Sequence, residues 1–128
     1  MPPIKSGQDK QLAQSLPTGS SATSIFSPTV LDLSGPEQDR GTSPREIIIT
    51  HAICCNVSGA KAEYSMYFDD DGTTYGDSTA ILKDVDIKKG ESHFIEMRLI
   101  MNQDAGNLAA FSRPNASVNF TITGELKA

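Results

Sequence analysis

The stretch FDDDGTTYGD, residues 68–77, places three carboxylates side by side before a glycine. Carboxylate oxygens are the ligands that calcium prefers, and the calcium loop of helix-loop-helix proteins follows the pattern D-x-[DN]-x-[DN]-G-x5-E. If Asp69 is the first position, Asp71 fits the pattern. Thr74 then takes the place of the glycine, and Ala80 takes the place of the bidentate glutamate. This register therefore lacks the ligand that calcium loops depend on most.

The other register of the acidic stretch fails as well, because starting at Asp70 puts Gly72 where a ligand belongs. Asp-Gly is a strong turn signal, since glycine accepts positive φ and aspartate bonds its own backbone. The sequence predicts an acidic turn without a bound metal. Gly72 is its sensitive position if its φ is positive, and Asp69 and Asp71 are the candidate ligands if the loop did hold an ion.

The two cysteines and two histidines are the other residues with metal or nucleophile chemistry. Cys54 and Cys55 are neighbours, so on a strand they point to opposite faces and cannot form an unstrained disulfide. We expect buried or half-buried thiols in a reducing compartment. His51 is in phase with apolar neighbours, which predicts a core or interface histidine with one satisfied nitrogen, and His93 at the start of a strand should be solvated.

No catalytic pattern joins these residues. The motifs G-x-S-x-G, H-E-x-x-H and G-x-x-x-x-G-K-[ST] are absent from the sequence. Asp84 and Asp86 form a carboxylate pair, but they flank Val85 on an expected strand and should face solvent. We therefore predict a binding protein that is not an enzyme and uses no cofactor.

Charge and hydropathy limit the partners. The 128 residues carry 11 Lys and Arg against 16 Asp and Glu, a formal charge of -5, and the only basic cluster is the pair Lys88 and Lys89. Nucleic-acid binding is not expected, because phosphate backbones need basic patches. No run of 18 apolar residues occurs, and the N-terminus lacks the apolar segment of a signal peptide, so we expect no membrane contact.

Composition divides the chain into two parts. Residues 1–24 are rich in Ser, Gln, Pro and Gly and have few apolar positions, which predicts an extended N-terminal arm that cannot fold alone. Residues 25–128 show short apolar runs separated by turn signals, which is typical of a β-sandwich. The sequence predicts that deleting residues 1–20 leaves the sandwich folded and weakens attachment to a partner.

Four segments have a strand pattern. Residues 46–57 are apolar at nearly every position, which indicates a central strand covered on both faces. Residues 62–68 and 117–126 alternate between apolar and polar, and residues 93–101 alternate more weakly and fit helical spacing in part. These features predict an all-β protein with a single antiparallel, jelly-roll-like β-sandwich.

The order of several segments resembles the small β-sandwich virion proteins of tailed bacteriophages. The segments are SIFSP, CCNVSG, YFDDDGTTY, LKDVDIKKGES and SVNFTITGEL, and they span about residues 24–126. The chain departs from the family pattern at residues 103–107, where QDAGN replaces the usual A-G-D turn, and in the long segment LDLSGPEQDRGTSPR.

The resemblance implies a structural protein of the virion that assembles in the host cytoplasm. We expect a capsid decoration (cement) protein, bound to the major capsid protein or other virion proteins and to copies of itself in a homotrimer. An acidic protein suits the outside of a capsid better than its DNA-facing inside. The apolar residues expected to contact a partner lie in the arm and the first strand: Ile4, Leu12, Leu16, Ile25 and Phe26.

Two alternatives remain open from the sequence. The first is a neck or tail component, which copy number would separate from a decoration protein. The second is a receptor- or carbohydrate-binding fibre domain, which would need exposed aromatic rings along a groove. Tyr67 and Tyr75, beside the acidic loop, are the candidates for such rings.

Overall fold

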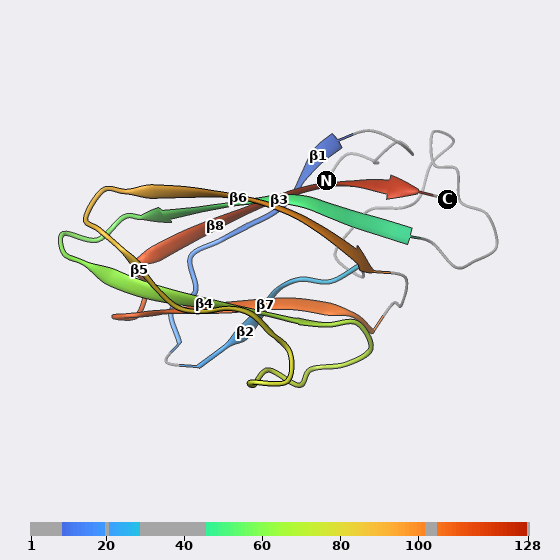
Figure 1. Cartoon of the computed structure of the whole chain (residues 1–128), viewed down its shortest axis with the longest axis horizontal. Coiled ribbons are helices and arrows are strands. Elements are labelled where there is room, and N and C mark those ends of the chain that lie inside the picture. The colour runs from blue at the N-terminus through green and yellow to red at the C-terminus, as the bar shows by residue number, and fades with distance from the viewer. Residues whose placement is uncertain (1–8, 20, 29–45, 102–104, 128) are drawn as a thin grey trace.

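The protein folds into two four-stranded antiparallel sheets that pack face to face (Figure 1). The computed structural model describes residues 9–19, 21–28, 46–101 and 105–127. The first sheet has the order β1 (Asp9–Ser15), β8 (Val118–Lys127), β3 (Glu46–Asn56) and β6 (Ser92–Met101). The second has the order β2 (Thr23–Phe26), β7 (Asn107–Arg113), β4 (Ala62–Asp69) and β5 (Ala80–Ile87).

The strands pair in a nested order. The first strand pairs with the last, β2 with β7, β3 with β6 and β4 with β5, while β8–β3 and β7–β4 complete the two sheets. This arrangement of eight strands is a jelly roll. The predicted antiparallel β-sandwich is confirmed. Among the described residues, no helix is long and apolar enough to cross a membrane.

The core lies between the sheets and follows the period-two patterns. Tyr64 and Met66 of β4 and Phe120 and Ile122 of β8 are almost completely buried, as their alternation predicts. Residues 93–101, whose sequence fits helical spacing in part, lie in strand β6. Their odd-numbered positions face the core cluster. Alternation of apolar and polar residues therefore outweighs the partial helical spacing in this segment.

β3 is an internal strand, as predicted, but only its first part is buried on both faces. Ile47, Ile48 and Ile49 are buried in succession. The register then shifts between Ile49 and His51 against both neighbouring strands. Beyond this shift Ile53 lies on the outer face and is 36% exposed, because an irregularity in the ladder changes which face the following side chains occupy.

The predicted boundary after residue 24 does not separate an arm from the sandwich. Residues 9–15 form β1, which is bonded along its length to β8. Leu12 is 2% exposed and belongs to the core cluster. This strand was not predicted because an edge strand needs only a few inward apolar residues, and DKQLAQS has few. The deletion of residues 1–20, predicted to leave the sandwich folded, removes this strand and Leu12, so we expect it to destabilise the sandwich. Residues 1–8 lie outside the described part.

Candidate functional site

A chain of polar side chains crosses the core at one end of the sandwich. Cys54 of β3 lies directly opposite His93 of β6. The hydroxyl of Tyr64 is 2.7 Å from His93 Nδ1, and His93 Nε2 is 3.2 Å from Glu91 Oε1. Because the carboxylate can only accept, Nε2 carries the proton in the neutral ring and Nδ1 accepts from the tyrosine. His93 is thus half-buried and bonded on both nitrogens, and the prediction that it is solvated is wrong.

This polar chain has no reactive nucleophile. Cys54 is fully buried, and burial raises the pKa of its thiol to about 12. Burial raises the pKa of the Tyr64 hydroxyl as well, so both groups stay protonated at neutral pH. The Lys88 N–H donates to Glu91 Oε1 over 3.0 Å and lowers the pKa of that carboxyl. This row of polar side chains therefore connects the β5–β6 turn to the core, and its role is structural.

The sequence contains a signal for this role of His93 that the prediction missed. Position 93 is in phase with Ile95 and Met97, which pack against the core. His51, by contrast, was expected at a core or interface position in phase with Ile49 and Ile53. After the register shift it lies half-buried beside Ile53, with its Nδ1 3.0 Å from Thr50 Oγ1 and its ring centroid 5.0 Å from that of Phe94.

The acidic loop is an aspartate turn closed on its own backbone. Asp69 accepts the N–H of Thr74 at 2.8 Å and that of Asp71 at 3.2 Å, one with each carboxylate oxygen. These donors lower the pKa of Asp69. The pKa of Asp71 is raised, because its side chain contacts the carboxylate of Asp69. Asp70 Oδ1 is buried and has no hydrogen-bond partner within the part of the chain that the structure describes. Among the described residues, no group of three or more His, Cys, Asp and Glu side chains could hold a metal ion.

Gly72 does not have the conformation that would make it sensitive through its backbone. Of the described glycines only Gly90 has a positive φ, 73°. A Cβ at position 72 would meet the flexible carboxylate of Asp69 at 3.2 Å. The condition for a sensitive Gly72, a positive φ, is therefore not met, and the hydrogen bonds of the turn come from the side chain of Asp69.

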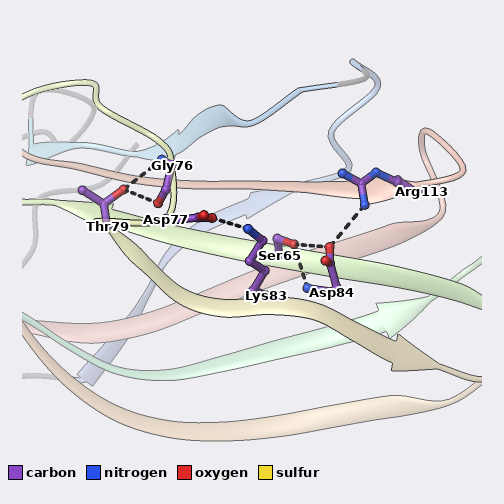
Figure 2. Close-up of polar contacts among 7 residues, drawn as sticks. All are labelled: Ser65, Gly76, Asp77, Thr79, Lys83, Asp84 and Arg113. Atoms are coloured by element: carbon purple, nitrogen blue, oxygen red, sulfur yellow. Dashed lines mark hydrogen bonds and ion pairs between the residues drawn. The ribbon is translucent and has the colours of Figure 1, made fainter.

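The outer face of the second sheet carries a group of mutually paired charges (Figure 2). Arg113 Nη1 is 3.2 Å from Asp84 Oδ1 and 3.3 Å from Glu63 Oε1, and Lys83 pairs with Asp77. Asp84 has a φ of 50°, and its N–H donates to Ser65 Oγ at 3.0 Å, which fixes a bulge in β5.

These outer-face charges have no catalytic arrangement. Asp84 and Asp86 are exposed, as predicted. Ser65 is buried, and its hydroxyl is bonded to Asp84. A serine nucleophile needs an adjacent base that can take its proton, and no histidine or lysine is bonded to this hydroxyl. The group stabilises the bulge and the end of β7.

The aromatic residues near this face do not form an exposed platform. Tyr67 stacks on Phe111 with ring centroids 6.3 Å apart and ring planes 7° apart. Both rings are buried, and Arg113 lies over Phe111 at 4.9 Å from its centroid. Tyr75 packs against the same cluster and is half-buried. These rings hold the loop onto the sheet.

The residues predicted to contact a partner have different positions in the fold. Leu12 and Phe26 are buried in the core, and Ile25 packs against it. Buried side chains cannot reach a partner of the folded protein, so the prediction is wrong for Leu12 and Phe26. Leu16 is 41% exposed and stays a candidate contact, whereas Ile4 lies outside the described residues.

An exposed apolar surface that the sequence did not predict lies over β3 and β6. We call it the β6 patch, and it consists of Ile53, Phe94 and Ile100. Phe94 is 61% exposed and lies opposite Ile53 in the ladder. Ile100 lies further along β6, beyond the exposed Glu96 and Arg98, so Ile53 and Phe94 are the two members that adjoin each other. Exposed apolar side chains that adjoin each other are typical of contact surfaces. The β6 patch and Leu16 are thus candidate surfaces for binding another protein.

Comparison with protein-family models gives no match, and comparison with curated protein sequences also gives none.

Proposed function

We propose that this protein is a non-enzymatic structural protein of a bacteriophage virion, and specifically a capsid decoration protein. It binds the assembled particle through protein surfaces and stabilises it. Its partners are the major capsid protein or other virion proteins, together with copies of itself. The site of action is the virion, assembled in the host cytoplasm.

The observation that supports this proposal best is the jelly-roll strand order. Jelly rolls occur in viral capsid proteins and in lectins, among other proteins, so the fold alone is compatible with several functions. The order of sequence segments resembles small virion proteins of tailed phages over the same residues. The formal charge of -5 suits a position on the outside of a particle that contains DNA.

The surface chemistry also favours binding over catalysis. The buried thiol of Cys54 is protonated, and the buried hydroxyl of Ser65 is bonded to Asp84, whose carboxylate is already paired with Arg113. The carbohydrate-binding alternative needs several exposed aromatic rings along a groove. Tyr67 is buried against Phe111 and Tyr75 is half-buried, and among the described aromatic residues only Phe94 is exposed. The β6 patch and Leu16, by contrast, present apolar side chains to solvent.

Quantitative mass spectrometry of purified phage particles tests the proposal. The number of copies is measured relative to the major capsid protein. Hundreds of copies per particle are expected for a decoration protein, and a few to a few dozen would assign it to the neck, tail or fibre instead. Absence of the protein from purified infectious particles would overturn the virion assignment altogether.

A further inference from the structure

β6 is an edge strand, and within the described residues no strand pairs with its outer side. An edge presents unpaired N–H and C=O groups, which can pair with a strand of another chain. β6 is ten residues long. The edge strand of the other sheet, β5, has two register shifts against β4 and a residue of positive φ, Asp84, whereas β6 has a single shift against β3 and no residue of positive φ among its described positions. β6 is therefore the more open of these two edges.

The exposed row of β6 has an order that complements itself. Exposed and half-buried residues alternate without a break from Ser92 to Ile100, even though the register against β3 shifts once opposite Thr50. The exposed row thus stays on one face. In chain order its central members are apolar, acidic, basic and apolar: Phe94, Glu96, Arg98 and Ile100.

We propose that two copies of this chain associate through their β6 edges, antiparallel, about a twofold axis at Met97. In this register Glu96 lies opposite Arg98 of the second copy, and Phe94 lies opposite Ile100 of the second copy. A twofold interface repeats each contact, so the two unlike charge pairs lie between two apolar pairs. The sheet that contains β6 in one copy then continues into the same sheet of the second copy.

Other registers are disfavoured by charge and by facing. A slip of two residues places Glu96 opposite Glu96 of the second copy, or Arg98 opposite Arg98 of the second copy, and like charges directly opposite each other are destabilising. A slip of one residue puts side chains of opposite faces against each other. Of these registers, only the one with the twofold axis at Met97 pairs each Glu96 with an Arg98 of the other copy.

The neighbouring strand enlarges the apolar part of this contact. Ile53 lies opposite Phe94 on β3, and the His51 ring also packs on Phe94. In the dimer, Ile100 of the second copy extends this row on the other side of Phe94. Cross-strand aromatic and aliphatic pairs of this kind stabilise sheets.

The pairing differs from the homotrimer expected from the sequence. A twofold edge contact uses the same surface on both copies and closes at two subunits, so it cannot generate a threefold ring. It goes beyond the proposed function, because it concerns association of the isolated protein whether or not the protein belongs to a virion. Failure of one proposal therefore leaves the other unaffected.

Light scattering and sedimentation of the purified full chain over a wide concentration range test the pairing. The wild type is expected to sediment as a dimer. Glu96→Arg and Arg98→Glu each turn both unlike pairs into like pairs and should raise the dimer dissociation constant by about tenfold or more. Both residues are exposed on β6, so the variants should stay folded, and their melting temperature should fall only by the concentration-dependent part that dimer formation adds.

Two rescue experiments test the register itself. The double variant Glu96→Arg with Arg98→Glu restores unlike pairs and should dimerise like the wild type. An equimolar mixture of the two single variants should form a heterodimer, because the basic row of one then faces the acidic row of the other. Asp86→Lys, on the β5 edge, is the matched control and should leave the dimer unchanged.

A monomeric or trimeric wild type would overturn the proposal. A dimer that persists in Arg98→Glu would also overturn it. The same holds if the single variants fold but neither the double variant nor the mixture of the two single variants forms a dimer. Hydrogen exchange gives an independent readout, since the outward amides of β6 should exchange more slowly in the wild-type dimer than in Arg98→Glu.

Discussion

Of the glycines that the structure describes, Gly124 of β8 has the least space for a side chain. A Cβ there would lie 2.2 Å from the Ile48 carbonyl oxygen, 2.9 Å from Leu12 Cδ1 and 3.0 Å from Ile49 Cα. Two of these atoms are backbone, so relief requires the sheet to move. Gly124→Ala should lower the free energy of unfolding by about 1–3 kcal/mol through overpacking, measured by urea denaturation.

Gly59 provides the control for this substitution. A Cβ at Gly59 would meet nothing within 4 Å. Gly59→Ala should therefore change the free energy of unfolding by less than about 0.5 kcal/mol. Equal losses in the two variants would contradict the crowding described at Gly124.

The two cysteines should differ in reactivity. Cys54 is fully buried and has a pKa raised to about 12, whereas Cys55 is half-buried on the outer face. In the folded protein at pH 8, iodoacetamide should modify the Cys54→Ala variant, which retains Cys55, much faster than the Cys55→Ala variant. Both variants should react readily in urea. Rapid modification of folded Cys55→Ala would show that Cys54 is accessible.

The acidic loop should depend on Asp69 and not on calcium. The N–H groups of Thr74 and Asp71 bond to Asp69 and lower its pKa below the ordinary 3.8. A carboxyl with a lowered pKa stabilises the folded loop above its unfolded pKa, and this stability is lost as the pH falls through the folded pKa. Carboxyl titration by NMR should therefore place Asp69 below 3.8 and Asp71, whose pKa is raised, above it.

Substitutions in the loop test the same point. Asp69→Ala removes both acceptors of the turn and should lower the melting temperature more than Asp71→Asn. Calcium should leave the wild-type melting temperature unchanged, because the Asp69 oxygens already accept backbone N–H groups. A rise with calcium that disappears in Asp71→Asn would mean that the loop is a cation site.

At the scale of elements, β1 decides whether the N-terminal segment is an arm or a strand. Leu12 is 2% exposed in the core, and Leu16, just beyond the strand, is 41% exposed. Leu12→Ala should lower the free energy of unfolding by about 2–5 kcal/mol, the usual range for a buried leucine. Leu16→Ala should cost less than about 0.5 kcal/mol. Similar small losses in both would restore the arm interpretation.

The pairing of β1 with β8 also has a consequence for β8. Without β1, the backbone groups of β8 that bond to residues 9–15 would lie at an open edge. An N-terminal truncation that removes β1 therefore changes both the core and the edge of the first sheet. Loss of particle binding after such a truncation would not by itself identify a contact, whereas Leu16→Ala can test that contact in a folded protein.

At the scale of the whole molecule, the nested pairing should make unfolding cooperative. Each sheet contains strands from both ends of the described chain, since β1 pairs with β8 and β2 with β7. Far-UV circular dichroism and tyrosine fluorescence should therefore give coincident urea transitions. Hydrogen exchange in which the β1 amides open well below the global transition would contradict this expectation.

Much of the fold follows from the sequence because the relevant signals are local. Alternation along residues 62–68, 93–101 and 117–126 predicts strands β4, β6 and β8 and their core faces. The Asp-Gly signal predicts the acidic turn. The isolated Cys54 and Cys55 predict buried or half-buried thiols, which the structure confirms. In each case a few neighbouring residues contain the information.

The tertiary structure decided what depends on residues far apart in the chain. Leu12 is buried because β1 bonds to β8 at the other end of the described chain, and no local pattern in a polar segment reveals that partner. The outward position of Ile53 follows from the register shift between Ile49 and His51, and the open edge of β6 follows from the strand order. Local alternation assigns two faces to a strand, but cross-strand pairing determines which face is covered and which edge stays free.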